Sequence, residues 1–146
     1  MTKIFEYKFK IYYEDTDAGG VVYYANYLKF IERARSEMIN SSGFSNTTLK
    51  EKFNLFFIVK YCNINYRKSA KLDDELIIFS SIVSLSKTSI VMKQDIKRGE
   101  ELIASTESIW TETNLMEWED GESIDGQTLP ISLSPFEIKT WKVKIS

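Results

Sequence analysis

One stretch of the chain brings carboxylates and glycines together at the point where a strand pattern gives way to a helix pattern. Asp15 and Asp17 precede Gly19 and Gly20, and Tyr24 then opens a long run with helical spacing. The first N–H groups of a helix lack intrahelical partners and carry partial positive charge. They can polarise a carbonyl, while a nearby carboxylate attacks the carbonyl carbon or removes a proton from water. The spacing therefore suits acyl transfer to water, with Asp17 as the carboxylate and the N–H of Tyr24 or a neighbour as the donor.

A purely structural role fits the same residues. Aspartate and glycine are common in turns, and an aspartate before a helix often does no more than cap it. The tyrosines around the turn also have an ordinary explanation, because aromatic residues are frequent in strands. The residues alone leave Asp17 either as a catalytic carboxylate or as part of a plain turn.

The composition narrows the available chemistry. The chain of 146 residues contains no histidine and one cysteine, Cys62. Catalysis by Ser-His-Asp or Cys-His groups is therefore excluded, and a zinc site with four nitrogen or sulfur ligands is not expected. Cys62 lies in an apolar run and is predicted to be a small core residue. We expect no metal and no separate cofactor, so acid–base chemistry falls to a carboxylate such as Asp17.

Charge and hydropathy bear on partners and compartment. The formal net charge is −2, and no basic stripe stands out, so nucleic acid is not an expected partner. No apolar run is long enough to span a bilayer, and the first residues lack the apolar core of a signal peptide. These features predict a cytoplasmic protein.

Periodicity predicts one long helix among several strands. Alternating and β-rich runs predict strands over 4–13, 56–66, 75–85, 88–97 and 101–113. Apolar residues at three- and four-residue spacing predict a helix over 24–40, and Thr48 with Glu51 fits the capping box of a short helix within 45–53. Runs of strands after a single long helix indicate one antiparallel α+β domain over 1–146.

The predicted long helix has a wide apolar face. Its members are Tyr27, Phe30, Ile31, Ala34 and Met38, with Leu28 and Ile39 broadening it. A face this wide needs a broad partner, such as a sheet that curves around the helix. On the polar side, Arg33 and Glu37 are spaced for a weak ion pair.

The last part of the chain carries turn and capping signals. Residues 115–129 are acidic and rich in turn signals, and we interpret them as a strand end followed by a loop. Ser134, Pro135 and Glu137 have the types and spacing of a helix start, which predicts a short helix through about Trp141.

The motif around Asp17 strongly resembles that of the hot-dog-fold acyl-CoA thioesterases. The likeness is greatest to the 4-hydroxybenzoyl-CoA thioesterase family and its YbgC-type branch, which is associated with the Tol–Pal gene cluster. It is carried by Tyr13-Glu14-Asp15-Thr16-Asp17-Ala18-Gly19-Gly20-Val21-Val22-Tyr23-Tyr24-Ala25-Asn26-Tyr27-Leu28-Lys29-Phe30 and by Glu32-Arg33-Ala34-Arg35. Weaker likeness continues through 64–70, 73–76 and 87–89 and thins after about Thr113.

The resemblance implies a fold, an activity and a set of site residues. The fold is a hot dog, in which a curved antiparallel sheet of about five strands wraps the long central helix. The activity is that of an acyl-CoA thioesterase, which hydrolyses the thioester of CoA or of acyl carrier protein to a free acid and a thiol. Asp17, rather than Asp15, is then the catalytic carboxylate, as nucleophile or general base, with the thioester carbonyl aimed at the N–H of Tyr24. Lys87 and Ser89 are the candidates for binding the CoA phosphates, and CoA enters only as part of the substrate.

The resemblance also implies an assembly. Proteins of this family pair their sheets into dimers, often dimers of dimers, and place their active sites at the subunit interface. We therefore expect a homo-oligomer, either a dimer or a homotetramer. Acyl carrier protein and membrane-associated lipid-synthesis proteins are further candidate partners.

One residue departs from the pattern of the YbgC-type branch, which usually carries histidine at the position of Tyr24. Tyrosine is a poor general base near neutral pH. Its hydroxyl can hydrogen-bond the carboxylate, a water or the acyl group, or its ring can simply line the acyl pocket. The departure leaves a second function open, namely a non-hydrolytic protein that binds acyl-CoA or acyl carrier protein on the same fold.

Overall fold

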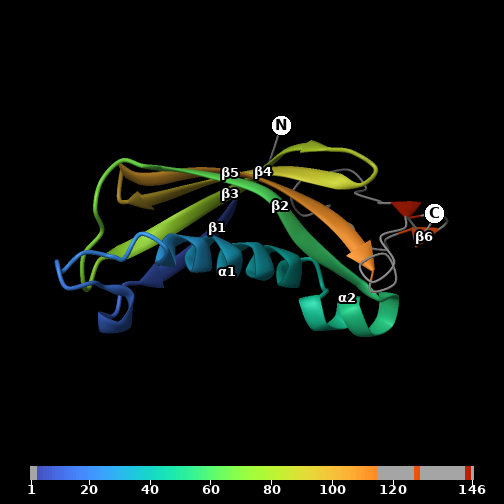
Figure 1. Ribbon diagram of the computed structural model, residues 1–146, viewed down its shortest axis with the longest axis horizontal. Coiled ribbons are helices and arrows are strands. Elements are labelled where there is room, and N and C mark those ends of the chain that lie inside the picture. The colour runs from blue at the N-terminus through green and yellow to red at the C-terminus, as the bar shows by residue number, and fades with distance from the viewer. Residues whose placement is uncertain (1–2, 115–126, 129–143, 146) are drawn as a thin grey trace.

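In the computed structural model, a curved five-stranded sheet wraps around one long helix (Figure 1). The structure describes residues 3–114, 127–128 and 144–145. The sheet contains β1 (Phe5–Lys10), β2 (Leu55–Tyr66), β3 (Glu75–Leu85), β4 (Ser89–Arg98) and β5 (Glu101–Asn114). Its strand order is β1-β3-β4-β5-β2, and every neighbouring pair is antiparallel. The predicted α+β arrangement of a long helix wrapped by an antiparallel sheet of about five strands is confirmed.

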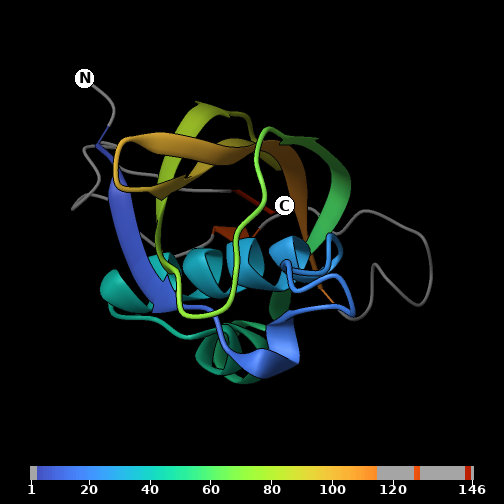
Figure 2. The ribbon, with the colours of Figure 1, turned by 90° about the vertical axis from the view of Figure 1, so that its left-hand side faces the viewer.

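The helices lie on one side of the sheet. Figure 2 shows α1 (Asn26–Ser41) beneath the strands, and α2 (Asn46–Phe53) follows it along the chain. A 3₁₀ turn, η1 (Tyr13–Asp15), precedes α1, and β6 (Gln127–Thr128) pairs with β7 (Lys144–Ile145). Within the described ranges, no helix is both long enough and apolar enough to cross a membrane.

Three irregularities of register accompany the curvature of the sheet. They leave one extra residue between Val59 and Tyr61 in β2, one between Ile82 and Ser84 in β3, and one, Ile103, in β5 opposite Ile96 and Lys97. An extra residue in one strand of a pair bends that strand and increases its local twist. The bends help one face of the sheet to cover the wide apolar face of α1.

The apolar face of α1 is buried largely as its spacing predicts. The buried side chains are Tyr27, Phe30, Ile31, Ala34, Met38 and Ile39. The expectation that Leu28 broadens this face is wrong, since Leu28 is 45% exposed. One residue step turns a helix by about 100° and carries position 28 off the buried stripe. Arg33 and Glu37, which both lie in the described part, form no ion pair with each other.

A buried polar side chain joins the sheet to the middle of the helix. Gln94 of β4 is fully buried, and its amide nitrogen donates to the Ile31 carbonyl and to the Ser80 hydroxyl, both at 3.0 Å. Such bonds fix the position of the helix along the sheet, because an apolar contact alone has no directional preference.

The first strand is shorter than its alternation predicts. β1 ends at Lys10, whereas the pattern extends the strand to residue 13. The alternation predicts that Ile11 and Tyr13 lie on the same face as Phe9; Ile11 is fully buried, but Tyr13 is 81% exposed. The reason is that the backbone enters η1 at Tyr13, where the period of two no longer applies.

The second helix is capped three residues earlier than the sequence motif suggests. Ser45 has an extended backbone, and its hydroxyl accepts the N–H of Thr48 at 3.0 Å. The box expected from Thr48 and Glu51 is therefore wrong, because both residues already lie inside α2. Serine is among the preferred residues for this capping position.

The apolar residues of 56–66 predict a largely buried strand, but β2 is half-buried or exposed beyond Leu55. It lies at the edge of the sheet, and β5 is its single neighbour among the strands that the structure describes. Val59, Tyr61 and Tyr66 are exposed, while Leu55 is buried. Cys62 is half-buried and packs against the core, and burial raises the pKa of its thiol.

Two sequence predictions lie outside the described residues. These are the loop within 115–129, apart from residues 127 and 128, and the C-terminal helix through about Trp141. Both stay predictions.

The burial difference along α1 gives a direct test of the packing. Phe30 is 1% exposed and its ring lies 4.7 Å from that of Phe9, centroid to centroid. We expect Phe30→Ala to lower the free energy of unfolding by about 3–5 kcal/mol, through lost transfer energy and a new cavity. Leu28→Ala is the control and should change it by about 0.5 kcal/mol or less.

Urea unfolding followed by far-ultraviolet circular dichroism measures both variants. Equal losses for the buried and the exposed position would contradict the assignment of the helix face.

Candidate active site

A tight turn between η1 and α1 holds Asp17 in place. The N–H of Asp17 donates to the Val21 carbonyl at 2.9 Å, and the N–H of Gly20 donates to the Asp17 carbonyl at 3.0 Å. Gly20 has a φ of 78°, a left-handed conformation that favours glycine. A bridge between Thr16 and Val22 closes the turn. The backbone of Asp17 is therefore fixed on both sides.

Asp15 has a structural role in the same segment. Its carboxylate accepts the N–H of Tyr12 at 2.9 Å. Its carbonyl accepts both the N–H of Tyr23 and the side-chain amide of Asn26, each at 2.9 Å. Because Asp15 is buried and its groups are already bonded, it is a poor candidate for chemistry. This arrangement is consistent with the choice of Asp17 over Asp15.

The carboxylate of Asp17 is exposed, and one of its two oxygens accepts a hydrogen bond from the described residues. One oxygen, Oδ1, accepts the N–H of Gly19 at 2.8 Å. For the other oxygen, Oδ2, the residues that the structure describes provide no hydrogen-bond donor. A Cβ at position 19 would lie 3.1 Å from Oδ1, so glycine leaves room for the carboxylate. The turn thus fixes one oxygen and leaves the second available to a substrate or a water.

The helix begins later than the sequence predicts, and this changes how Tyr24 is placed. α1 starts at Asn26, with Ala25 as its cap residue, so Tyr24 lies just before the helix instead of in its first turn. The N–H of Asn26 is bonded to the Tyr23 carbonyl at 2.9 Å. In contrast, the N–H of Tyr24 donates to no oxygen of the described chain. The free donor at position 24 is therefore supplied by the turn before the helix.

Asp17 and Tyr24 line one pocket of about 320 Å³. Its remaining lining residues are Val21, Val22, Tyr27, Tyr66, Arg67, Lys68 and Ser69. The Tyr66 hydroxyl donates to the Tyr24 carbonyl at 2.9 Å and connects the end of β2 to the turn. The structure therefore brings together two of the four site residues predicted from the sequence.

Two tyrosines of the pocket remain protonated near neutral pH. Burial raises the pKa of the Tyr27 hydroxyl, and burial followed by the proximity of Tyr24 raises that of Tyr66. The Tyr27 hydroxyl also accepts the N–H of Ala70 at 3.3 Å. These hydroxyls can donate or accept hydrogen bonds, but they do not act as bases.

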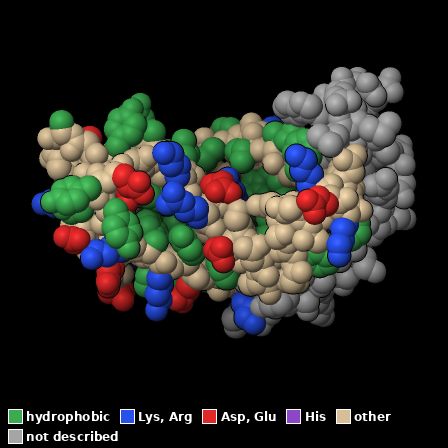
Figure 3. Space-filling view, turned by 90° about the horizontal axis from the view of Figure 1, so that it is seen from below, with side chains coloured by type: hydrophobic (Ala, Val, Ile, Leu, Met, Phe, Trp, Pro, Cys, Tyr) green, Lys and Arg blue, Asp and Glu red, His purple; other side chains and the backbone are tan. Residues whose placement is uncertain are grey.

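The sequence did not single out the residues of the pocket wall that follow β2. Tyr66, Arg67, Lys68 and Ser69 come from the end of β2 and the loop after it, far from Asp17 along the chain. The weaker likeness through 64–70 is the only signal for them, because the residue type of Arg67 by itself indicates an ordinary surface charge. Exposed tyrosines surround the same end of the molecule, and Figure 3 shows hydrophobic side chains gathered there.

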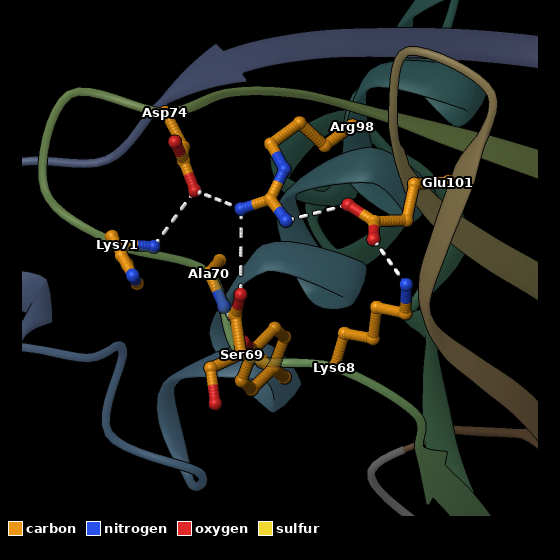
Figure 4. Close-up of polar contacts among 8 residues, drawn as sticks. Lys68, Ser69, Ala70, Lys71, Asp74, Arg98 and Glu101 are labelled. Carbon is orange, nitrogen blue, oxygen red and sulfur yellow. Dashed lines mark hydrogen bonds and ion pairs between the residues drawn. The ribbon is translucent and has the colours of Figure 1, made fainter.

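A network of charges holds the loop of the pocket wall against the β4–β5 hairpin (Figure 4). The Arg98 guanidinium donates to Asp74 at 2.6 Å, to Glu101 at 2.5 Å and to the Ser69 carbonyl at 3.4 Å. Lys68 donates to the other oxygen of Glu101 at 2.5 Å. The hydrogen bonds from Lys68 and Arg98 lower the pKa of the Glu101 carboxyl.

Lys87 and Ser89 lie at the other end of the sheet from Asp17 in the same chain. Ser89 is paired with Thr111 of β5, whereas the N–H of Arg67 bonds the Ile103 carbonyl. Eight residues of an extended strand separate these two positions, or about 26 Å. The Ser89 hydroxyl lies 2.7 Å from that of Ser86 in the β3–β4 turn. A single chain therefore does not bring the predicted phosphate-binding pair to the carboxylate.

Known proteins share both the fold and the sequence of this region. A family model described as the thioesterase superfamily matches residues 19–119. An acyl-CoA thioesterase YbgC of Haemophilus influenzae is 43% identical over 95 residues, which cover 65% of this chain and 70% of the relative. An acyl-CoA thioester hydrolase YbgC of Escherichia coli is 43% identical over 99 residues, or 68% and 73% of the two chains.

A solved structure agrees with these relatives. A probable thioesterase from Bartonella henselae superposes with a TM-score of 0.75 at 34% identity, over 77% of this chain and 94% of the other. A long helix wrapped by a curved antiparallel sheet is the arrangement of the hot-dog class. The chain belongs to the thioesterase superfamily, and its resemblance to the YbgC-type branch is confirmed.

The network in Figure 4 predicts a pH dependence of stability. Because the pKa of Glu101 is lower in the folded chain, its bonds stabilise the fold fully above the unfolded-state pKa of about 4.3. This contribution disappears as the pH falls through the lower, folded-state pKa. We therefore expect Glu101→Gln to lower the urea midpoint near neutral pH and to approach the wild type on acidification.

Glu100→Gln is the matched control, since Glu100 is exposed and joins none of the ion pairs seen in the described ranges. Its urea midpoint should follow that of the wild type at every pH. A Glu101→Gln deficit that stays constant down to strongly acidic pH would rule out the charge network as its cause.

Proposed function

We propose that this chain is an acyl-CoA thioesterase, with Asp17 as its catalytic carboxylate. The observation that carries the proposal is the shared pocket of Asp17 and Tyr24, in which one carboxylate oxygen and one backbone N–H have no hydrogen-bond partner among the described residues. Membership of the thioesterase superfamily supports it, as do the names of the relatives from Haemophilus influenzae and Escherichia coli.

The proposed reaction follows from these two groups. The thioester oxygen accepts the N–H of Tyr24, which stabilises the negative charge that develops on that oxygen. The free oxygen of Asp17 removes a proton from water, and the water oxygen bonds to the carbonyl carbon. The C–S bond then breaks, the acid is released, and the proton passes to the leaving thiolate.

Direct attack by Asp17 is the other course of the same reaction. It forms a mixed anhydride and expels the thiolate, after which water cleaves the anhydride. Oxygen-18 water in a single turnover reveals an anhydride that water cleaves at the aspartyl carbon. General-base catalysis puts the label directly into the product acid, whereas cleavage of an anhydride at the aspartyl carbon leaves it on Asp17.

The decisive experiment compares the wild type with Asp17→Asn on short, long and aromatic acyl-CoAs, with release of the free thiol as the readout. We expect the substitution to lower kcat by about 10²–10⁴-fold, the usual contribution of a positioned base. Glu14→Gln is the matched control, because Glu14 is an exposed carboxylate in the same segment. Its activity should match the wild type.

Equal activity of wild type and Asp17→Asn on the best substrate would remove Asp17 from the mechanism. Saturable binding of acyl-CoA without thiol release, in the wild type itself, would favour the non-hydrolytic binding protein. Tyr24, in place of the histidine of the YbgC-type branch, is the residue that motivates this second candidate.

We further propose that two copies pair through β2 and share each site. β2 is an edge strand, and unpaired strand edges are normally covered. An antiparallel pair of β2 strands places the Leu55 end of one copy beside the Tyr66 end of the other. Because Ser89 lies at the Leu55 end of its own sheet, Lys87 and Ser89 of one copy approach Asp17 of the other.

Hybrid dimers test this sharing. A Lys87→Met chain paired with an Asp17→Asn chain contains one complete site if the site is shared, and none if each chain uses its own residues. We expect the hybrid to recover about half of the wild-type kcat with a normal KM for acyl-CoA. Light scattering that shows only a 17.0 kDa monomer would contradict the arrangement.

A cytoplasmic location, a homotetramer, and contacts with acyl carrier protein or lipid-synthesis proteins stay predictions.

A further inference from the structure

A second pocket, between α1 and β2, has no part in the proposed hydrolysis. Its volume is about 260 Å³. It is lined by Glu32, Arg35, Ser36, Ile39, Asn46, Phe56, Phe57, Val59 and Trp110. Most of its wall is apolar or aromatic, as in sites that bind the hydrocarbon part of a small molecule. Arg35 is the one cation among these lining residues.

The N–H groups of the Arg35 guanidinium have no hydrogen-bond acceptor among the described residues. The guanidinium lies over the Trp110 ring, 5.3 Å from the centroid, and is half-buried. Among the residues that the structure describes, no oxygen accepts a hydrogen bond from it and no carboxylate lies within ion-pair distance. Burial lowers the pKa of Arg35, in keeping with its partial removal from water. A guanidinium offers five N–H donors, and leaving them unbonded in such a place is unfavourable.

A stripe of α1 connects this pocket to the catalytic turn. Leu28, Glu32 and Arg35 line a shallow hollow on the helix surface, and the last two also line the pocket at Trp110. Positions four and seven residues apart share one face of a helix. Nine residues from Asn26, where α1 starts, to Arg35 correspond to about 14 Å along the helix axis. A thioester carbonyl held at Tyr24 can therefore direct its acyl chain along the exposed Leu28 toward Arg35.

We propose that Arg35 determines acyl-group specificity, by binding an oxygen at the far end of the acyl chain, with a carboxylate preferred. This inference rests on the proposed function, because it assigns the acyl group of the same substrate. Guanidinium and carboxylate form paired, charge-assisted hydrogen bonds, which are about twice as strong as neutral ones. The apolar wall around Arg35 excludes water and strengthens them.

Glu32 weakens the preference of Arg35 for a carboxylate. Its carboxylate is exposed, accepts the Ser36 hydroxyl at 2.7 Å and lies on the rim of the same pocket. It raises the pKa of Arg35 by its charge and would repel a bound carboxylate. Water and salt screen an exposed charge, so the direct bonds to Arg35 dominate.

The test uses three acyl-CoAs with the same chain length, ending in a carboxylate, a hydroxyl or a methyl group. For the wild type we expect kcat/KM to be about tenfold or more higher for the carboxylate than for the methyl group, the value of one charge-assisted bond. Arg35→Met should abolish or reverse this ratio, and Arg35→Lys should retain part of it. Lys50→Met is the control, since Lys50 is an exposed cation of α2 that lines neither this pocket nor the hollow, and it should keep the wild-type ratio.

Glu32→Gln removes the negative charge of this side chain and keeps its size. It should raise kcat/KM a few-fold for the carboxylate substrate and leave the hydroxyl and methyl substrates unchanged. An equal increase for all three would mean that Glu32 acts on the fold and would count against the proposal.

A binding measurement tests the role of Arg35 independently of thioester hydrolysis. Calorimetry on Asp17→Asn, with and without Arg35→Met, measures the affinity for the carboxylate- and methyl-ended CoA esters without hydrolysis. Preference for the carboxylate that disappears with Arg35 supports the inference even if no thioester is cleaved. Hydrolysis of all three esters at equal rates, with equal affinities, would overturn it and leave the thioesterase activity standing. Pairing of Arg35 with a carboxylate of a second copy would give that same negative result.

Discussion

The carbonyl of Asp15 holds the candidate site together. It accepts the N–H of Tyr23 and the side-chain amide of Asn26, and so fixes the turn to the first residue of α1. The Asp15 carboxylate, bonded to the N–H of Tyr12, fixes the other end of the segment to the chain leaving β1. With both ends fixed, the turn has little freedom, and Asp17 projects from it into the pocket. Pre-organisation of this kind lets a carboxylate act without first being ordered by its substrate.

The wrapping of the sheet decides which residues face Asp17. The buried side of α1 requires a curved cover, and this cover is built from all five strands, with β2 at its edge. The edge position brings Tyr66 and the following loop to the start of α1, where the Tyr66 hydroxyl bonds the Tyr24 carbonyl. It also leaves one side of the pocket wall at an edge strand of the described sheet. The same constraint that covers the core therefore leaves the site at the border of the chain.

Two arginines show how the surroundings of one side-chain type set its role. Arg98 donates to Asp74, to Glu101 and to a backbone carbonyl, so its charge is satisfied and it fixes the loop after β2. Arg35 has an aromatic ring beneath it and no oxygen partner in the part of the chain that the structure describes. The sequence presents both as charged residues in ordinary surroundings. Only the positions of the neighbouring oxygens separate a structural arginine from one with unused donors.

The sequence by itself determined the long helix, the order of the main strands and, through its resemblance to a known family, the candidate Asp17. These features depend on local pattern and composition. They are the period of two in the strands, the helical stripe through Phe30 and the absence of histidine. Contacts between distant segments were decided by the tertiary structure alone. These include the position of Tyr66 at the turn, the start of α1 at Asn26 and the separation of Lys87 from Asp17. Strand pairing is non-local, so the residues that share a pocket depend on strand order and register, which no short stretch of sequence encodes.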